Sequence, residues 1–260
     1  MLNIRPIGYI VGILVVILGV SMILPLLIDI YFKDEHWKIF GYSSFITITS
    51  GALLIFSCSN SFPTNFSIQQ TFLLTVSIWL ILPIFGSIPF IIGWSDASFV
   101  DGFFESMSGL TTTGATVFSV LETFPEGLLF WRGLLQWFGG IGIIVMAITL
   151  MPIMNVGGMQ LFKISSNDSS EKILPKSKEI ALRLIYIYSG LTIVCALTYW
   201  LFGMSKFDSL THAMTTIATG GFSNYNQSIG YFDSIPIEIA SMIFIVLGSC
   251  LLYTSPSPRD

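Results

Sequence analysis

The chain has 260 residues, of which 53% are hydrophobic and only 10% are charged, and its mean hydropathy is +0.80. Long uncharged runs and a hydropathy this high lie outside the range of soluble domains. The net charge of −4 and the lack of a basic patch with interleaved aromatic residues give no indication of nucleic-acid binding. The composition therefore indicates an integral, all-α membrane protein.

Two uncharged runs come first, Pro6 to Ile28 and Ile39 to about Cys58. Each is long enough to cross roughly 30 Å of hydrocarbon at about 1.5 Å per helical residue. The first run follows Arg5 like a signal peptide, but it exceeds an h-region of roughly 7 to 15 residues and lacks a clear small-x-small exit. We expect it to stay in the mature chain, and we assign residues 1–62 to an N-terminal pair of transmembrane helices.

Further spans are expected along the rest of the chain, at about Gln69 to Trp94, Leu128 to Met154, Ile180 to Gly203, and from near Ile235 onward. Pro83 and Pro89 lie inside the third span, so a kink is predicted there. Two segments of about thirty residues, between the third and fourth spans and between the fifth and sixth, are too polar to span the membrane and too apolar for simple loops.

These two segments repeat each other. Residues 206–223 match residues 99–116 without a gap when the chain is shifted by 107 positions, so that Asp208 falls on Asp101 and Gly221 falls on Gly114. Each copy is a span, a short amphipathic segment and another span, and duplicated membrane units are common in transport proteins. We assign residues 63–162 to a first pore repeat and residues 163–249 to an incomplete second one.

The basic residues set the orientation, because positively charged short loops stay cytoplasmic. The loop from Asn155 to Arg183 carries Lys163, Lys172, Lys176, Lys178 and Arg183. Counting spans backward predicts a multi-pass protein of the cytoplasmic (inner) membrane with a cytoplasmic N-terminus and both pore segments outside.

Acidic residues precede any basic residue in the first outer segment: Asp96, Asp101, Glu105, Glu122 and Glu126. An outer mouth lined by carboxylates would concentrate cations. For Glu122 and Glu126, ordinary solvated loop positions explain the sequence equally well.

The stretch LTTTGATVF, residues 110–118, suits an ion filter. Backbone carbonyl oxygens can replace the water molecules around a cation. They bind the cation less tightly than a fully charged group would, so it can leave again. To present several carbonyls to one axis the chain must leave helical geometry, and Gly114 and Gly221 supply the necessary freedom. Irregular backbone at membrane depth must be buried or line a watery cavity, so the sequence predicts re-entrant loops.

A short pore helix is predicted before each glycine, at about Gly102 to Leu110 and about Ser209 to Ile217. Asp101 and Asp208 stand where N-caps are expected. Asp208 and His212 have the spacing of a proton relay or half a metal site. The repeat places Asp101 and Glu105 at the same positions, and this favours a shared capping and vestibule role.

Three other features are assigned structural roles. Arg132, at the outer end of the fourth span, either snorkels or pairs with a filter-loop acid, and we favour structural anchoring. Gly139-Gly140-x-Gly142 lies inside an apolar span and indicates close helix packing rather than phosphate binding. Cys58, Cys195 and Cys250 have no metal-ligand spacing and predict no disulfide framework.

The chain resembles the Trk/Ktr/HKT potassium-transporter superfamily, in its bacterial Trk form. The matching stretches, within about residues 85–249, are FVDGFFESMSGLTTTGATV, FWRGLLQWFGGIGIIV, MPIMNVGGMQLFK and FDSLTHAMTTIATGGFSNYNQSIGYFDSIPIEI. The extra N-terminal helix pair is similar to the Trk branch. The resemblance implies potassium uptake through four helix–pore-helix–helix repeats, two of which are present, with K⁺ as the transported ion and no organic cofactor or enzymatic activity.

Carried over position by position, the resemblance implies six ion contacts: Thr112, Thr113 and Gly114 in the first repeat, and Thr219, Gly220 and Gly221 in the second. It also implies a homodimer in the lipid bilayer, gated by a cytosolic nucleotide-binding regulatory subunit. Residues 250–260, CLLYTSPSPRD, resemble a translated sequencing adaptor, so we expect a truncated gene with a non-native tail.

Two alternatives stay open. A sodium-coupled or sodium-permeable cation carrier differs from a potassium pathway by ion selectivity, which the sequence does not determine, and channel-like and coupled transport are equally compatible with it. An intramembrane enzyme would need a base and an orienting acid near one nucleophile. His36 and His212 are the two histidines, and the first repeat has no counterpart of His212.

Overall fold

The computed structural model describes residues 4–59, 67–94, 96–154 and 170–253. These residues form helices and no strand, as the sequence predicts. The α-helices are α1 (Arg5–Ser21), α2 (Ile23–Phe32), α3 (Trp37–Cys58), α4 (Ile68–Gly86), α5 (Ile88–Gly93), α6 (Phe99–Leu110), α7 (Glu126–Met154), α9 (Ser170–Leu201), α10 (Lys206–Ile217) and α11 (Ile235–Tyr253). Two 3₁₀ turns, η1 (Leu121–Thr123) and η2 (Ser228–Phe232), lie between them.

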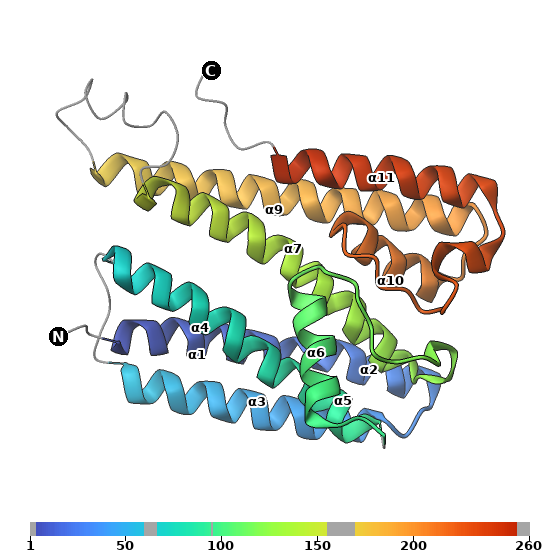
Figure 1. Cartoon of the computed structure of the whole chain (residues 1–260), viewed down its shortest axis with the longest axis horizontal. Coiled ribbons are helices and arrows are strands. Elements are labelled where there is room, and N and C mark those ends of the chain that lie inside the picture. Colours follow the sequence, from blue (N-terminus) through green and yellow to red (C-terminus); the bar gives the residue numbers. More distant parts are fainter. Residues whose placement is uncertain (1–3, 60–66, 95, 155–169, 254–260) are drawn as a thin grey trace.

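The long helices lie side by side and alternate in direction (Figure 1). The beginnings of α1, α4 and α9 and the ends of α3 and α7 lie toward one end of the molecule, and α11 runs in the same direction as α7 but stops about halfway along α9. Four stretches of the described chain are long and apolar enough to cross a membrane: Arg5–Phe32, Trp37–Cys58, Gln69–Gly93 and Leu182–Leu201. Helix α7, with 29 residues, extends for about 43 Å at 1.5 Å per residue.

The outer surface of these helices is apolar, which is the expected property of a protein whose solvent is lipid. Leu53, Phe56 and Leu201 are 67%, 76% and 77% exposed. In water such large apolar patches would cause aggregation, whereas in a bilayer they contact acyl chains.

The predicted kink in the third span lies at Ser87, which separates α4 from α5. Pro83 lies inside α4 and Pro89 begins α5, and neither can donate a backbone hydrogen bond. A similar break at Met22 separates α1 from α2. The short α5 then leads the chain back toward α6, which stands across the long helices (Figure 1).

Helix α7 joins two apolar cores. The first core lies among the helices up to α7 and includes Phe40, Phe90 and Trp131. The second lies among α9, α10 and α11 and includes Tyr188 and Tyr199. Figure 1 shows α7 running diagonally between the two groups, and this position allows its side chains to reach both pore segments.

Two predicted helix starts are wrong, and one helix continues into the segment expected to be a non-native tail. Helices α6 and α10 begin at Phe99 and Lys206, three residues before the expected starts. Helix α11 continues to Tyr253, beyond the expected change at residue 250, because Cys-Leu-Leu-Tyr is apolar and the first proline comes later. The remaining tail and residues 155–169, with Lys163, lie outside the described residues, whereas the other four basic residues expected in the inner loop belong to α9.

Candidate functional site: two filter loops

Each pore helix begins with a serine cap. Ser98 accepts a hydrogen bond from the Asp101 amide at 3.2 Å, and Oδ2 of Asp101 accepts from the Ser98 amide at 3.0 Å. Ser205 likewise accepts from the Asp208 amide at 3.0 Å. The prediction that the aspartates are the N-caps is therefore wrong. They occupy the third helical position, where a carboxylate complements the helix dipole, and Asp101 also completes a capping box with Ser98. The Ser-x-x-Asp pattern, present in both repeats, could have revealed this.

Both pore helices end with the same hydrogen bonds. In the first repeat the amides of residues 111, 112 and 113 donate to the carbonyls of residues 107, 109 and 108. In the second repeat the amides of residues 218, 219 and 220 donate to the carbonyls of residues 214, 216 and 215. Every donor and acceptor is shifted by the same 107 positions as the sequence repeat. The duplication therefore extends to the backbone geometry of the filter loops.

The two loops also share an unusual backbone conformation. Thr112 and Thr219 have φ values of 54° and 53°, and Gly114 and Gly221 have φ values of 76° and 84°. A left-handed threonine costs roughly 1–2 kcal/mol, so tertiary contacts must hold these residues in place. Residues 113 and 220 have negative φ. Alternation of positive and negative φ turns successive peptide planes, which is the geometry needed to direct several carbonyls along one path.

The loops meet at their glycines. Gly114 lies so close to the carbonyl oxygen of Gly220 that a β-carbon on Gly114 would overlap it. Gly220 in turn packs against the side-chain amide of Gln136 on α7. The side of Gly221 is open, and it borders a cavity of about 210 Å³ that is also lined by Thr219, Gly220, His212 and Ser241. Of the predicted site residues, the structure therefore brings Gly114 of the first repeat into contact with Gly220 of the second, and Thr219, Gly220 and Gly221 border one cavity.

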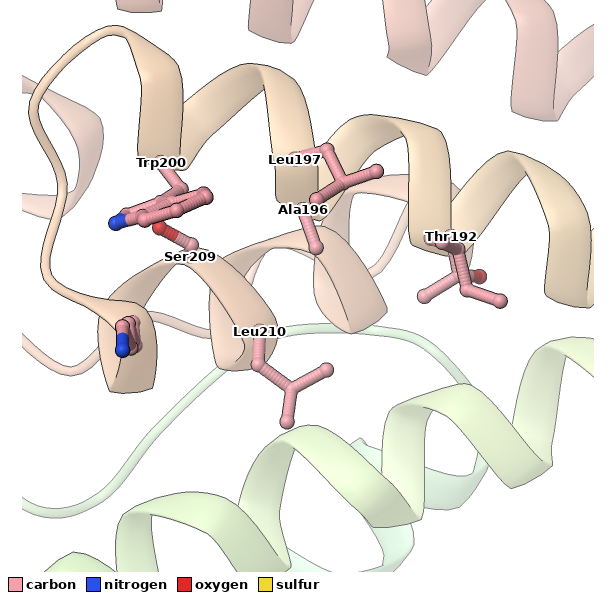
Figure 2. Close-up of a pocket in the computed structure, with 8 residues that line it drawn as sticks. Thr192, Ala196, Leu197, Trp200, Ser209 and Leu210 are labelled. Atoms are coloured by element: carbon pink, nitrogen blue, oxygen red, sulfur yellow. The ribbon is translucent and has the colours of Figure 1, made fainter.

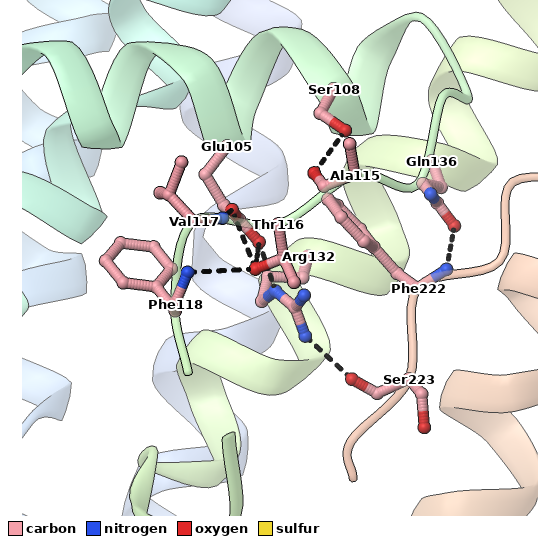
Figure 3. A network of polar contacts seen from close by, with 10 residues as sticks. All are labelled: Glu105, Ser108, Ala115, Thr116, Val117, Phe118, Arg132, Gln136, Phe222 and Ser223. Atoms are coloured by element: carbon pink, nitrogen blue, oxygen red, sulfur yellow. Dashed lines mark hydrogen bonds and ion pairs between the residues drawn. The ribbon is translucent and has the colours of Figure 1, made fainter. Parts of the chain in front are cut away.

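Behind the first loop lies a buried ion pair (Figure 3). Nε of Arg132 donates to Oε1 of Glu105 at 2.7 Å, and both residues are at most 1% exposed. Glu105 also accepts from the hydroxyl of Thr116 at 3.0 Å and from the amide of Val117 at 3.2 Å. The expected vestibule role of Glu105 is wrong, because its carboxylate is shielded from solvent. Of the two alternatives for Arg132, the pairing with an acid is the one observed.

In the second repeat His212 takes the place of Glu105. Its Nδ1–H donates to the Asp208 carbonyl at 2.9 Å, and its Nε2 accepts from the hydroxyl of Ser223 at 3.0 Å. His212 is 2% exposed, so its expected vestibule role is also wrong. The described residues contain no cluster of three or more His, Cys, Asp or Glu side chains that could hold a metal ion.

The Ser223–His212 contact has the distance of a nucleophile–base pair, but the group behind the imidazole is a main-chain carbonyl. The Asp208 carboxylate is directed elsewhere and accepts from Ser205, Asn224 and Tyr225. An orienting acid, which the enzyme hypothesis requires, is therefore not placed at this histidine. The same residues form a local network that holds the chain after the second filter loop.

The outer acids are not all free. Glu122 accepts two hydrogen bonds from Asn226, from its backbone and side-chain amides, both at 2.8 Å. Asn226 also donates to the carbonyl of Ser119. These contacts connect the segment between α6 and α7 with the segment between α10 and α11. Glu126 begins α7, where a negative charge complements the helix dipole.

A second cavity lies on the outside of the second repeat (Figure 2). It has a volume of about 270 Å³, runs between α9 and α10, and is bordered mainly by apolar side chains such as Ala196, Leu197, Trp200 and Leu210. The ammonium group of Lys206 lies 5.8 Å from the ring centre of Trp200 at one end. No predicted filter residue borders this cavity.

Comparisons with known proteins show which family the chain belongs to. The family model described as "TrkH: Cation transport protein" matches residues 35–251. The chain belongs to this family. It is 40% identical to the Trk system potassium uptake protein TrkH of Vibrio parahaemolyticus over 95% of the chain, and 40% identical to that of Escherichia coli over 96%.

A crystal structure of the potassium transporter TrkH from Vibrio parahaemolyticus matches the fold with a TM-score of 0.83 and 38% sequence identity, over 95% of this chain and 50% of the other. The chain spans about half the length of the curated relatives it matches, 51% and 52% for the two proteins above. Its relatives are cation transport proteins, and family membership therefore favours a transporter over an enzyme.

Proposed function

We propose that this chain carries two of the four pore segments of a potassium uptake protein in the bacterial cytoplasmic membrane. In this proposal K⁺ is the transported ion, and the chain itself binds no organic cofactor. The relatives are named as potassium uptake proteins, and the two re-entrant segments provide the corresponding chemistry.

The proposal rests mainly on one observation. Two loops that are related by the sequence repeat adopt the same alternating left-handed conformation and touch each other at Gly114 and Gly220. Neither loop has an ionisable side chain between residues 111 and 115 or between residues 218 and 222. Uncharged, preshaped backbone on both sides of a contact point is what a carbonyl filter requires.

We infer that the ion contacts are backbone carbonyls and threonine hydroxyls of Thr112, Thr113, Gly114, Thr219, Gly220 and Gly221. The open side of Gly221, toward the 210 Å³ cavity, supports an ion path past the second loop. Further pore segments would complete the ring of carbonyls.

The proposal extends to orientation and assembly. The N-terminus is cytoplasmic, and the protein functions as a homodimer with a cytosolic nucleotide-binding regulatory subunit. The basic loop within residues 155–183 and the family membership support these inferences.

Substitution of Gly221 by serine tests the filter. Gly221 has φ of 84° and open space around it, so serine would be strained without a steric clash. In the protein expressed at the length its gene encodes, we expect rubidium-over-sodium uptake to fall about tenfold, since a strain of about 1.4 kcal/mol changes an equilibrium tenfold. Uptake is measured with both ions in the same cells.

Gly203 provides a matched control. It also has positive φ (107°) and open surroundings, but it lies in the turn between α9 and α10, away from the filter. Gly203→Ser carries similar backbone strain and should keep the native ion preference. Unchanged selectivity in Gly221→Ser, at native expression, would contradict the filter assignment.

A further inference from the structure

One side chain of α7 touches both pore segments. Nε of Arg132 donates to Glu105 on α6, and its Nη1 donates to the carbonyl oxygen of Ser223 at 2.7 Å (Figure 3). The guanidinium group also lies 4.2 Å from the ring centre of Phe222, which directly follows the second filter loop. A planar, multiply donating cation is suited to such a three-sided contact, and lysine could not reproduce it.

The partners of Arg132 lie next to the filter in both repeats. The Glu105 carboxylate accepts from Thr116 and Val117, two and three residues after Gly114. Ser223 stands two residues after Gly221. One buried ion pair therefore holds the residues that follow both filter loops. The Glu105 carboxylate binds those after the first loop, and the Arg132 guanidinium group binds those after the second.

Gln136 repeats this contact one helical turn further along α7. Its Oε1 accepts from the amide of Phe222 at 3.1 Å, and its amide group packs against Gly220. Arg132 and Gln136 are four residues apart and lie on one face of the helix. Together they hold the second loop at its glycine and at the two residues after Gly221.

Among the described residues, the second repeat has no equivalent cross-link. Gly139 of α7 packs against the carbonyl of Leu110, and Gly248 of α11 packs in the same way against the carbonyl of Ile217. The helices that follow the two filter loops, α7 and α11, can therefore be aligned on these glycines. In this alignment Ser241 occupies the place of Arg132, and His212 takes the place of Glu105. The charged pair is therefore particular to the junction between the first and second repeats.

Stability alone does not account for a buried pair of this kind. The loss of hydration of two buried charges can exceed their attraction, and apolar residues of similar size often stabilise a fold equally well. Two buried donors beside the second loop, Nη2 of Arg132 and Nε2 of Gln136, have no hydrogen-bond partner within the described part of the chain. A requirement to hold the second loop in a fixed position explains this arrangement better than stability does.

We propose that Arg132 is a positioning residue for the ion filter, and that its contacts with Glu105 and the Ser223 carbonyl set the spacing of the two filter loops. The inference rests on the proposed potassium pathway. The arginine itself contacts no ion; it acts through the backbone on either side of the Gly114–Gly220 contact. Its removal should therefore alter which cation passes rather than abolish passage.

The decisive variant is the double substitution Arg132→Met with Glu105→Gln. Because both charges are removed together, no uncompensated buried charge is left, and the variant should fold. We expect rubidium-over-sodium discrimination to fall about tenfold, the size expected for one charge-assisted hydrogen bond, while the maximal rate of rubidium uptake stays within about twofold. Arg132→Lys, which keeps the charge but loses the Ser223 and Phe222 contacts, should give an intermediate loss.

The ratio of two ions in one preparation does not depend on how much protein has folded, so a purely structural role would leave it unchanged. Lys38→Met removes the exposed Lys38–Glu35 pair, at 3.3 Å, and serves as the control with native selectivity. Native discrimination in the folded double variant would overturn the inference. Absence of rubidium uptake in the native protein would instead refute the proposed potassium pathway.

Discussion

Ser98 and Asp101 satisfy each other's hydrogen bonds at the first turn of α6, and this arrangement affects the ionisation of the carboxylate. The side-chain and then the backbone hydrogen bonds from Ser98 hold the pKa of Asp101 below its usual value of 3.8. The same serine and aspartate recur at Ser205 and Asp208, so the entry of each pore helix is fixed locally.

Substitution of Ser98 by alanine should destabilise the protein by about 1 kcal/mol, because one amide of the first turn loses its acceptor. Thermal unfolding in detergent measures the change. Ser77→Ala is the control, since the exposed Ser77 hydroxyl donates only to the Leu73 carbonyl of its own helix. Equal melting temperatures for Ser98→Ala and native protein would contradict the capping role.

The lowered pKa of Asp101 also predicts a pH dependence. A carboxylate whose folded-state pKa lies below its unfolded value contributes stability above the unfolded pKa, and this is lost as the pH falls through the folded value. We expect Asp101→Asn to be less stable than the native protein above about pH 4 and the difference to shrink at lower pH. A difference that is constant from pH 7 to pH 3 would exclude this origin.

At the scale of helices, α7 organises the site by close contact with its neighbours. Its beginning is capped from α2, because Oδ1 of the buried Asp29 accepts from the Gly127 amide at 2.6 Å. Its middle approaches the end of α6 at Gly139, where a β-carbon would overlap the Leu110 carbonyl. The N-terminal helix pair and the first pore helix are thus both anchored on α7.

Gly139→Ala should therefore disturb the protein, whereas Gly142→Ala should not. Both glycines lie in α7, but Gly142 has no atom within 4 Å of an added β-carbon. We expect a loss of roughly 1–3 kcal/mol for Gly139→Ala, from overpacking against backbone. Gly142→Ala should be neutral or slightly stabilising, since alanine favours helix. Unfolding of both variants in detergent compares them, and equal stabilities would refute the close-packing role.

At the scale of the whole molecule, the long helices alternate in direction, so that successive spans run in opposite directions through the bundle. The end of α3 and the segment between α10 and α11 lie at opposite ends of the bundle (Figure 1). The proposed function requires that both re-entrant segments enter from the same side of the membrane, as the 107-residue repeat also implies.

Cysteine labelling tests this topology. In a background lacking Cys58, Cys195 and Cys250, a membrane-impermeant thiol reagent should label Gln227→Cys in intact cells. Ser59→Cys, exposed at the opposite end, should react only after the cells are permeabilised. The reverse pattern would invert the proposed orientation and place the acidic outer loops in the cytoplasm.

The sequence alone determined the membrane class, the order of the spans, the pore segments and the kink, because hydrocarbon demands long apolar runs and proline lacks the backbone N–H that continues a helix. It also determined the repeat, since Gly114 and Gly221 keep the same spacing from the residues around them. These are local properties, and they can be seen without knowing what lies nearby in space.

Only the tertiary structure decided which side chains contact one another across the helices. Arg132 and Glu105 are 27 residues apart, and Arg132 and Ser223 are 91 apart. No periodicity indicates that these groups meet or that Glu105 is buried rather than at the mouth. Asp29 and Gly127 are 98 residues apart and are joined in the same way. Hydropathy predicts which span a residue belongs to. It does not predict which helix the residue contacts, because that depends on how the helices pack around α7.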